Sequence, residues 1–81
     1  MARTKDESFM LRLYEEALKR SEIDEPIDRY VIGQMIGLQK TALDTICNTL
    51  AQTNFIKKRG PNEVSITPQG IRLIEELKGK R

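Results

Sequence analysis

Two amphipathic helical patterns separated by a glycine constrain this chain more than any other feature. Apolar residues recur at helical spacing on both sides of Gly37: Val31, Met35, Ile36, Ala42, Leu43, Ile46, Cys47 and Leu50. The spacing predicts a short helix over 29–36, a tight turn, and a longer helix from 39 or 40 to 52 or 53. Asp28 suits the N-cap of the short helix. Gly37 suits its end, because glycine enters the left-handed conformation without steric cost.

A basic β-hairpin is predicted directly after the longer helix. The sequence KKR at 57–59 begins the first strand, and GPN at 60–62 supplies residues that favour turns. Over 63–67, apolar residues alternate around Ser65, as they do in a strand with one buried face. Asn54 is expected to end the longer helix in the left-handed conformation, which asparagine tolerates better than most residues.

A first helix is predicted to begin near Asp6 or Ser8, either of which suits an N-cap, and to run to about residue 20. We expect residues 1–5, which are polar, to be disordered. The predicted helix has one apolar stripe: Phe9, Met10, Leu13, Tyr14, Ala17 and Leu18. Phe9, Met10 and Tyr14 of this stripe, or the last helix, are also candidate surfaces for a dimer.

The remaining elements follow from two prolines. Pro26 disfavours helix in the residue before it, so a very short strand around 26–27 is expected beside the hairpin. Thr67 suits the N-cap of a last helix with Pro68 at its first position, where the missing N–H has no cost. At 81 residues, we expect a single domain over 1–81.

The composition argues against several classes of function. A lone Cys47 and the absence of histidine leave no internal disulfide, no zinc ligand set and no histidine base, so we expect no enzyme, metal site or cofactor. No small-molecule ligand is expected either. No apolar run approaches the ~20 residues of a membrane span, and MARTKDES lacks the apolar core of a signal peptide. These features predict a cytoplasmic protein.

In this order, the segments resemble the winged helix-turn-helix superfamily in the style of bacterial MarR-type repressors. The sequence IGQMIGLQKTALDTICNTLAQTNFI matches the helix-turn-helix pattern, KKR begins the wing, and ITPQGIRLIEEL is similar to the helix that follows many wings. The resemblance implies an α+β fold that is mostly helical, with a three-helix core, a small β-hairpin wing and a C-terminal helix. It also implies a recognition helix at about 39–52 in the major groove of double-stranded DNA.

The resemblance transfers DNA-facing positions to both segments. On the helix and the wing these are Gln39, Lys40, Thr41, Asp44, Thr45, Asn48, Lys57, Lys58 and Arg59. Gln39 and Asn48 have the paired donor and acceptor that suit adenine, and Lys40 can reach guanine or a phosphate. The wing cations suit phosphates or the minor groove. A transcription regulator, acting as a homodimer on paired half-sites or with a partner protein, is the function this implies.

Two features keep a second reading open. Asp44 places a negative charge on the outer face of the helix, where it is free to pair with Lys40, and Thr45 stands where the family often has arginine. The net charge is only +2, from 14 basic and 12 acidic residues. A near-neutral helix also suits a protein-interaction module on the same fold, which need not contact DNA. RNA binding has less support, because the chain has only four aromatic residues for stacking.

Overall fold

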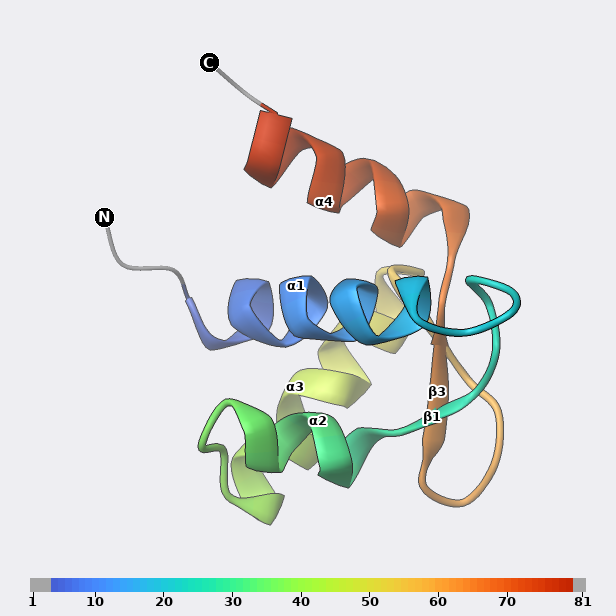
Figure 1. Ribbon diagram of the computed structural model, residues 1–81. Coiled ribbons are helices and arrows are strands. Elements are labelled where there is room, and N and C mark those ends of the chain that lie inside the picture. The colour runs from blue at the N-terminus through green and yellow to red at the C-terminus, as the bar shows by residue number, and fades with distance from the viewer. Residues whose placement is uncertain (1–3, 80–81) are drawn as a thin grey trace.

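The computed structural model describes residues 4–79 as four helices and a small sheet (Figure 1). The elements follow one another in this order: α1 (Lys5–Leu18), β1 (Ile27–Asp28), α2 (Arg29–Met35), α3 (Lys40–Gln52), β2 (Ile56–Lys58), β3 (Glu63–Ile66) and α4 (Pro68–Gly79). The predicted class is confirmed: the protein is mostly helical, with a β-hairpin after α3 and a C-terminal helix. No helix in this part of the chain is both long and apolar enough to cross a membrane.

Helix α1 begins earlier than the sequence predicts. Thr4 is its N-cap, and a capping box joins the Thr4 hydroxyl to the Glu7 amide at 3.2 Å and the Glu7 carboxylate to the Thr4 amide at 3.1 Å. The assignment of the cap to Asp6 or Ser8 is therefore wrong, and Lys5 is the first residue of the helix. Residues 1–3 lie outside the described part of the chain. Helix α1 ends at Leu18 rather than at about residue 20.

The helix-turn-helix forms where the local signals predict it. The Asp28 carboxylate accepts a hydrogen bond from the Tyr30 amide at 2.9 Å and caps α2. Gly37 has a φ of 75° in the turn, and Asn54 has a φ of 66° after α3. Gly33 allows the two helices to approach, because a Cβ at this position would lie 2.7 Å from Cδ2 of the buried Leu43.

The sheet has three antiparallel strands in the order β1-β3-β2. The short strand predicted around 26–27 is confirmed as β1, with Ile27 opposite Val64. In the hairpin, Lys57 pairs with Ser65 and Lys58 with Val64. Because successive side chains leave a strand on opposite faces, Lys58 lies on the same face as the fully buried Val64, and Lys57 lies on the other.

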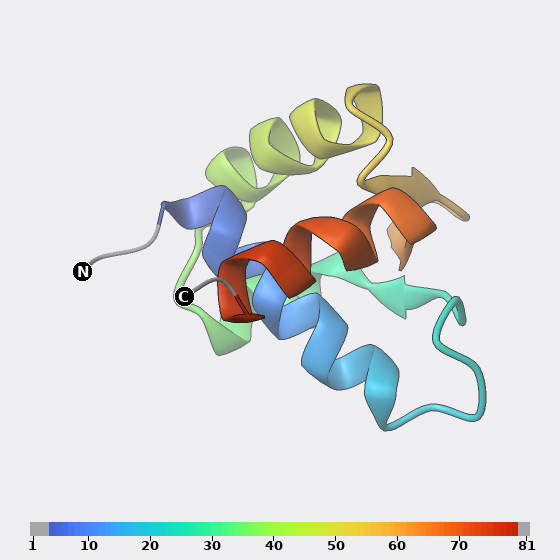
Figure 2. The ribbon, with the colours of Figure 1, turned by 90° about the horizontal axis from the view of Figure 1, so that it is seen from above.

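Helix α1 is the centre of the fold. It packs against α4 on one side and against α2 and α3 on the other, and from above α4 crosses over it (Figures 1 and 2). The side chains of Phe9 and Met10 are fully buried, so they belong to the core and not to a dimer surface. Leu18 lies on the predicted stripe but is 57% exposed. The buried core joins all layers: Phe9, Met10, Leu13, Ala17, Ile27, Ile32, Leu43, Cys47, Leu50, Ile56, Val64, Ile66 and Ile74.

A close backbone contact fixes the start of α4. Thr67 caps this helix as predicted, and its hydroxyl accepts a hydrogen bond from the Gly70 amide at 3.0 Å and donates one to the Asn54 carbonyl. The Thr67 amide donates to the Phe55 carbonyl at 3.3 Å. A Cβ on Gly70 would lie 2.2 Å from that same carbonyl oxygen, so only glycine fits here without a backbone shift.

Replacement of Gly70 by alanine is expected to destabilise the fold by ~1–3 kcal/mol, because the added methyl group meets a backbone oxygen that side-chain motion cannot displace. Urea unfolding followed by circular dichroism measures the effect. Gly79→Ala is the matched control, since Gly79 lies in the same helix and nothing lies within 4 Å of its missing Cβ. Equal midpoints for the two variants would contradict this packing.

Cys47 is buried as predicted, and burial raises the pKa of its thiol from 9.0 to about 11. In the unfolded chain the thiol ionises first, so its contribution to stability is complete below about pH 9 and is lost as pH rises to about 11. The difference in unfolding free energy between wild type and Cys47→Ala should shrink across this window. A constant difference between pH 8 and 11 would show that the thiol ionises as easily in the folded protein.

Candidate nucleic-acid interface

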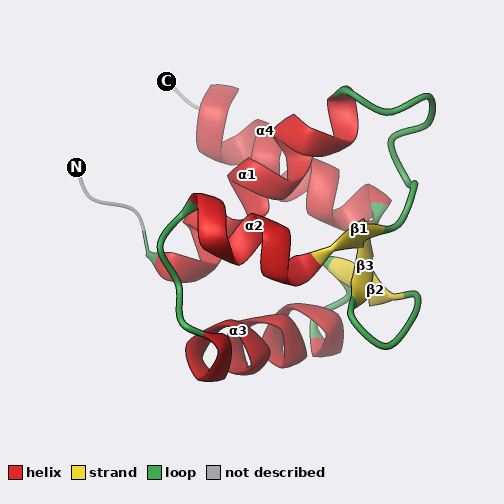
Figure 3. Cartoon of the chain, turned by 60° about the horizontal axis from the view of Figure 1, so that its bottom comes forward, coloured by secondary structure: helices red, strands yellow, loops and turns green. Residues whose placement is uncertain are grey.

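Helix α3 presents a long polar face to solvent. Figure 3 shows the helix along the lower edge of the molecule, with its outer side clear of other elements. Leu43, Cys47 and Leu50 form its buried side. The predicted positions Gln39, Lys40, Thr41, Thr45 and Asn48 are all exposed.

The wing places positive charge beside this face. The Lys58 ammonium donates a hydrogen bond to Oδ1 of Asn48, which joins the first strand of the hairpin to the middle of α3. The Arg59 side chain is exposed, and its amide donates to the Glu63 carbonyl at 2.9 Å where the hairpin turns. Lys57 is exposed too, but it leaves the strand on the opposite face from Lys58. Of the three wing cations, Lys58 is thus the one that contacts α3.

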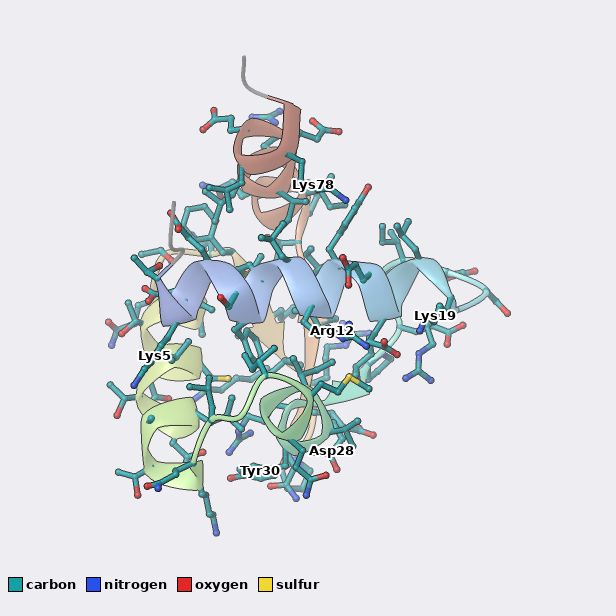
Figure 4. All side chains as sticks on the ribbon, turned by 60° about the vertical axis from the view of Figure 1, so that its left-hand side comes forward. Lys5, Arg12, Lys19, Asp28, Tyr30 and Lys78 are labelled. Atoms are coloured by element: carbon teal, nitrogen blue, oxygen red, sulfur yellow. The ribbon has the colours of Figure 1, made fainter. Side chains whose placement is uncertain are left out.

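Asp44 differs from the other predicted positions, because it is half-buried and already engaged. Its Oδ1 accepts hydrogen bonds from the Tyr30 hydroxyl at 2.9 Å and from Nε and Nη2 of Arg29 at 3.4 and 3.3 Å. Its ion-pair partner is therefore Arg29, not Lys40 as the sequence allowed. The Lys40 ammonium lies 5.7 Å from the centre of the Tyr30 ring instead. Figure 4 shows Tyr30 at the end of the molecule farthest from Lys78.

Arg29 connects α3 to the β2–β3 hairpin. Besides its bonds to Asp44, its Nη1 donates to the Pro61 carbonyl at 3.1 Å, and its amide donates to the Asn62 carbonyl at 2.9 Å. The side chain is only 14% exposed. Burial by itself lowers the pKa of the guanidinium, but hydrogen bonds and charge interactions with Tyr30 and Asp44 outweigh it and raise the pKa above its ordinary value. Arg29 therefore stays charged while it holds α2, α3 and the hairpin turn together.

This pairing changes the charge that the face presents. Between residues 39 and 63 the acidic side chains are Asp44 and Glu63, and Arg29 compensates the first of them. The cations of the same segment are all exposed: Lys40, Lys57, Lys58 and Arg59. The exposed surface of this segment is therefore more positive than the near-neutral sequence of the helix suggests.

Sequence reasoning missed Arg29, Tyr30 and the exposed Thr49. One signal for Arg29 was present: a cation in the first turn of a helix is unfavourable for the helix dipole, so its position there calls for a compensating partner. That partner is 15 residues away in the sequence, and no local pattern identifies it.

The arrangement of elements is compatible with a winged helix: three helices, an antiparallel sheet that includes the hairpin after α3, and a terminal helix. Neither a scan against models of protein families nor a search of curated proteins finds a match for this sequence.

Replacement of Arg29 by alanine is expected to destabilise the protein by ~1–3 kcal/mol, since it leaves Asp44 and the Pro61 carbonyl without this donor. Arg12→Ala is the matched control. Arg12 also pairs with acids, Glu15 and Glu16, but it is 38% exposed and its ion pairs lie within α1. Its loss should cost less than ~1 kcal/mol. Urea titrations measure the unfolding free energies of both variants. Similar values would show that Arg29 stabilises the fold no more than the exposed Arg12 does.

Proposed function

We propose that this protein is a member of the winged helix-turn-helix superfamily that binds double-stranded DNA, and that it acts as a small transcription regulator. Helix α3 would lie in the major groove, with the β2–β3 hairpin against the sugar-phosphate backbone. The observation that carries this proposal is the contact of Lys58 with Asn48, which puts the cationic wing and the exposed polar face of α3 on one side of the molecule.

The dimensions of α3 suit this role. Thirteen residues make a helix about 20 Å long, and its outer residues are polar without being bulky. The major groove of B-DNA is about 12 Å wide and admits one α-helix. Arg29 holds the wing turn and α3 in a fixed relation, so both can contact the duplex without a costly rearrangement.

The wing cations supply affinity rather than sequence discrimination. Lys57, Lys58 and Arg59 are exposed and adjacent, and phosphate is the anion that a duplex presents regularly along both strands. Each phosphate that a cation neutralises releases condensed counterions, so this part of the binding weakens as salt rises. Lys40 adds a fourth cation near the start of α3.

One observation favours a protein partner in addition. Val31 and Met35, one turn apart on α2, are 44% and 45% exposed. Apolar groups at this spacing form a small stripe that a partner protein or a second copy could cover. The alternative function, a protein-interaction module without DNA contact, would use this stripe instead of α3.

Titration of isotope-labelled protein with a generic DNA duplex at low salt is expected to shift the backbone amides of 39–48 and 57–59. A Lys58→Ala/Arg59→Ala variant should bind more weakly, and the slope of log K against log salt should be smaller in magnitude by about one unit for each cation removed. Lys78→Ala is the control, because Lys78 lies on α4, far from this face (Figure 4). It should leave the slope unchanged.

Two results would contradict DNA binding. Amides of 39–48 and 57–59 that stay unchanged at low salt would exclude α3 as a DNA-reading helix, since non-specific binding should then be at its strongest. An equal loss of affinity in the Lys78 control would show general charge attraction instead of a defined face. Either result would favour the alternative function, in which a protein partner binds the apolar stripe formed by Val31 and Met35.

A further inference from the structure

Three exposed threonines follow one another at four-residue spacing along α3 and its C-cap, and each of their hydroxyl groups donates to a backbone carbonyl of the helix: Thr45, Thr49 and Thr53. The Thr45 hydroxyl donates to the Thr41 carbonyl, that of Thr49 to the Thr45 carbonyl, and that of Thr53 to the Thr49 carbonyl, each at 3.1 Å. A hydroxyl has one proton to donate. These exposed threonines therefore offer a partner their methyl groups and oxygen lone pairs, but no free hydrogen-bond donor.

The other side chains on this face offer few of the hydrogen-bonding groups that read guanine or adenine. Guanine is read through two acceptors, usually by arginine, and α3 contains no arginine. Its one lysine, Lys40, lies near the Tyr30 ring at the flank of the helix. The paired contact that asparagine makes with adenine needs its carbonyl oxygen, and in Asn48 that oxygen already accepts from Lys58.

The helix thus presents a row of threonine methyl groups, which can make apolar contact with a methyl group on a base in the major groove. Thymine has a C5-methyl group there, and threonine methyl groups make apolar contact with it. Thr45 and Thr49 lie one turn apart on the side opposite the buried Leu43 and Cys47. A straight helix in the groove would bring both toward base edges instead of toward phosphates.

We propose that α3 recognises thymine methyl groups through Thr45 and Thr49, so that the protein favours A·T-rich duplexes over G·C-rich ones. The inference rests on the proposed function, because it assigns the sequence preference of the same face. Burial of one methyl group is worth about a fourfold change in affinity, so two such contacts give about a sixteenfold preference.

The test compares duplexes that differ only in this methyl group. Fluorescence anisotropy measures the affinity for alternating poly(dA-dT) and for poly(dA-dU), which carries the same phosphates without the methyl. We expect binding to the uracil duplex to be about sixteenfold weaker. Alternating poly(dG-dC) with 5-methylcytosine restores a methyl group at the same ring position. It should bind more tightly than the unmethylated polymer.

Two double variants separate the methyl group from the hydroxyl. Thr45→Ser/Thr49→Ser keeps both hydroxyl groups and removes both methyl groups, so it should bind the thymine and uracil duplexes equally. Thr45→Val/Thr49→Val keeps methyl groups and should retain the preference. Valine, serine and threonine have similar helix propensities, and circular dichroism verifies that each variant folds. Any difference in shape between the two duplexes acts on all three proteins alike.

The outcomes distinguish the two proposals. Tight binding with equal affinity for thymine and uracil duplexes would overturn methyl recognition and leave DNA binding intact. A preference that persists unchanged in the serine variant would also overturn it, since the threonine methyl groups would then have no part. Absence of binding to every duplex at low salt would overturn the proposed function together with this inference.

Discussion

The arrangement of the polar face depends on one guanidinium group. Arg29 begins α2, reaches Asp44 on α3 and bonds to the Pro61 carbonyl in the hairpin turn. The Tyr30 hydroxyl also donates to Asp44, and only 14% of the Arg29 side chain remains exposed. Hydrogen bonds to charged groups are stronger than neutral ones, and the planar fork of arginine fixes direction as well as distance. The position of the wing relative to α3 is therefore determined by polar geometry in addition to apolar packing.

The sequence predicts those features whose causes are local. Asp28, Gly37, Asn54 and Thr67 each act on backbone within a few residues, and each has the predicted role. The cap of α1 is also local, but Thr4 competed with two equally suitable residues, and the capping box with Glu7 decided in its favour.

Features with distant causes could not be predicted. The role of Gly70 depends on the Phe55 carbonyl, which is 15 residues earlier in the sequence. The role of Asp44 depends on Arg29, and on the sequence alone its carboxylate counts against a nucleic-acid partner. The structure shows this charge compensated at the flank of the helix. The exposed charges of the face are thereby separated: cations on the wing and at the start of α3, and uncharged groups along its outer line.

The Lys58–Asn48 contact joins the cationic wing to the uncharged outer line of α3. The contact is exposed, so water competes for both groups and its net contribution to stability is small. A phosphate placed near the wing would be a stronger partner for the Lys58 ammonium than a neutral amide oxygen. Transfer of Lys58 to a phosphate would free the Asn48 carbonyl oxygen, and the amide would then regain the donor and acceptor pair that adenine requires. Adenine lies opposite thymine, so under the proposed thymine recognition backbone contact by the wing would add an adenine-reading group beside the threonine methyl groups.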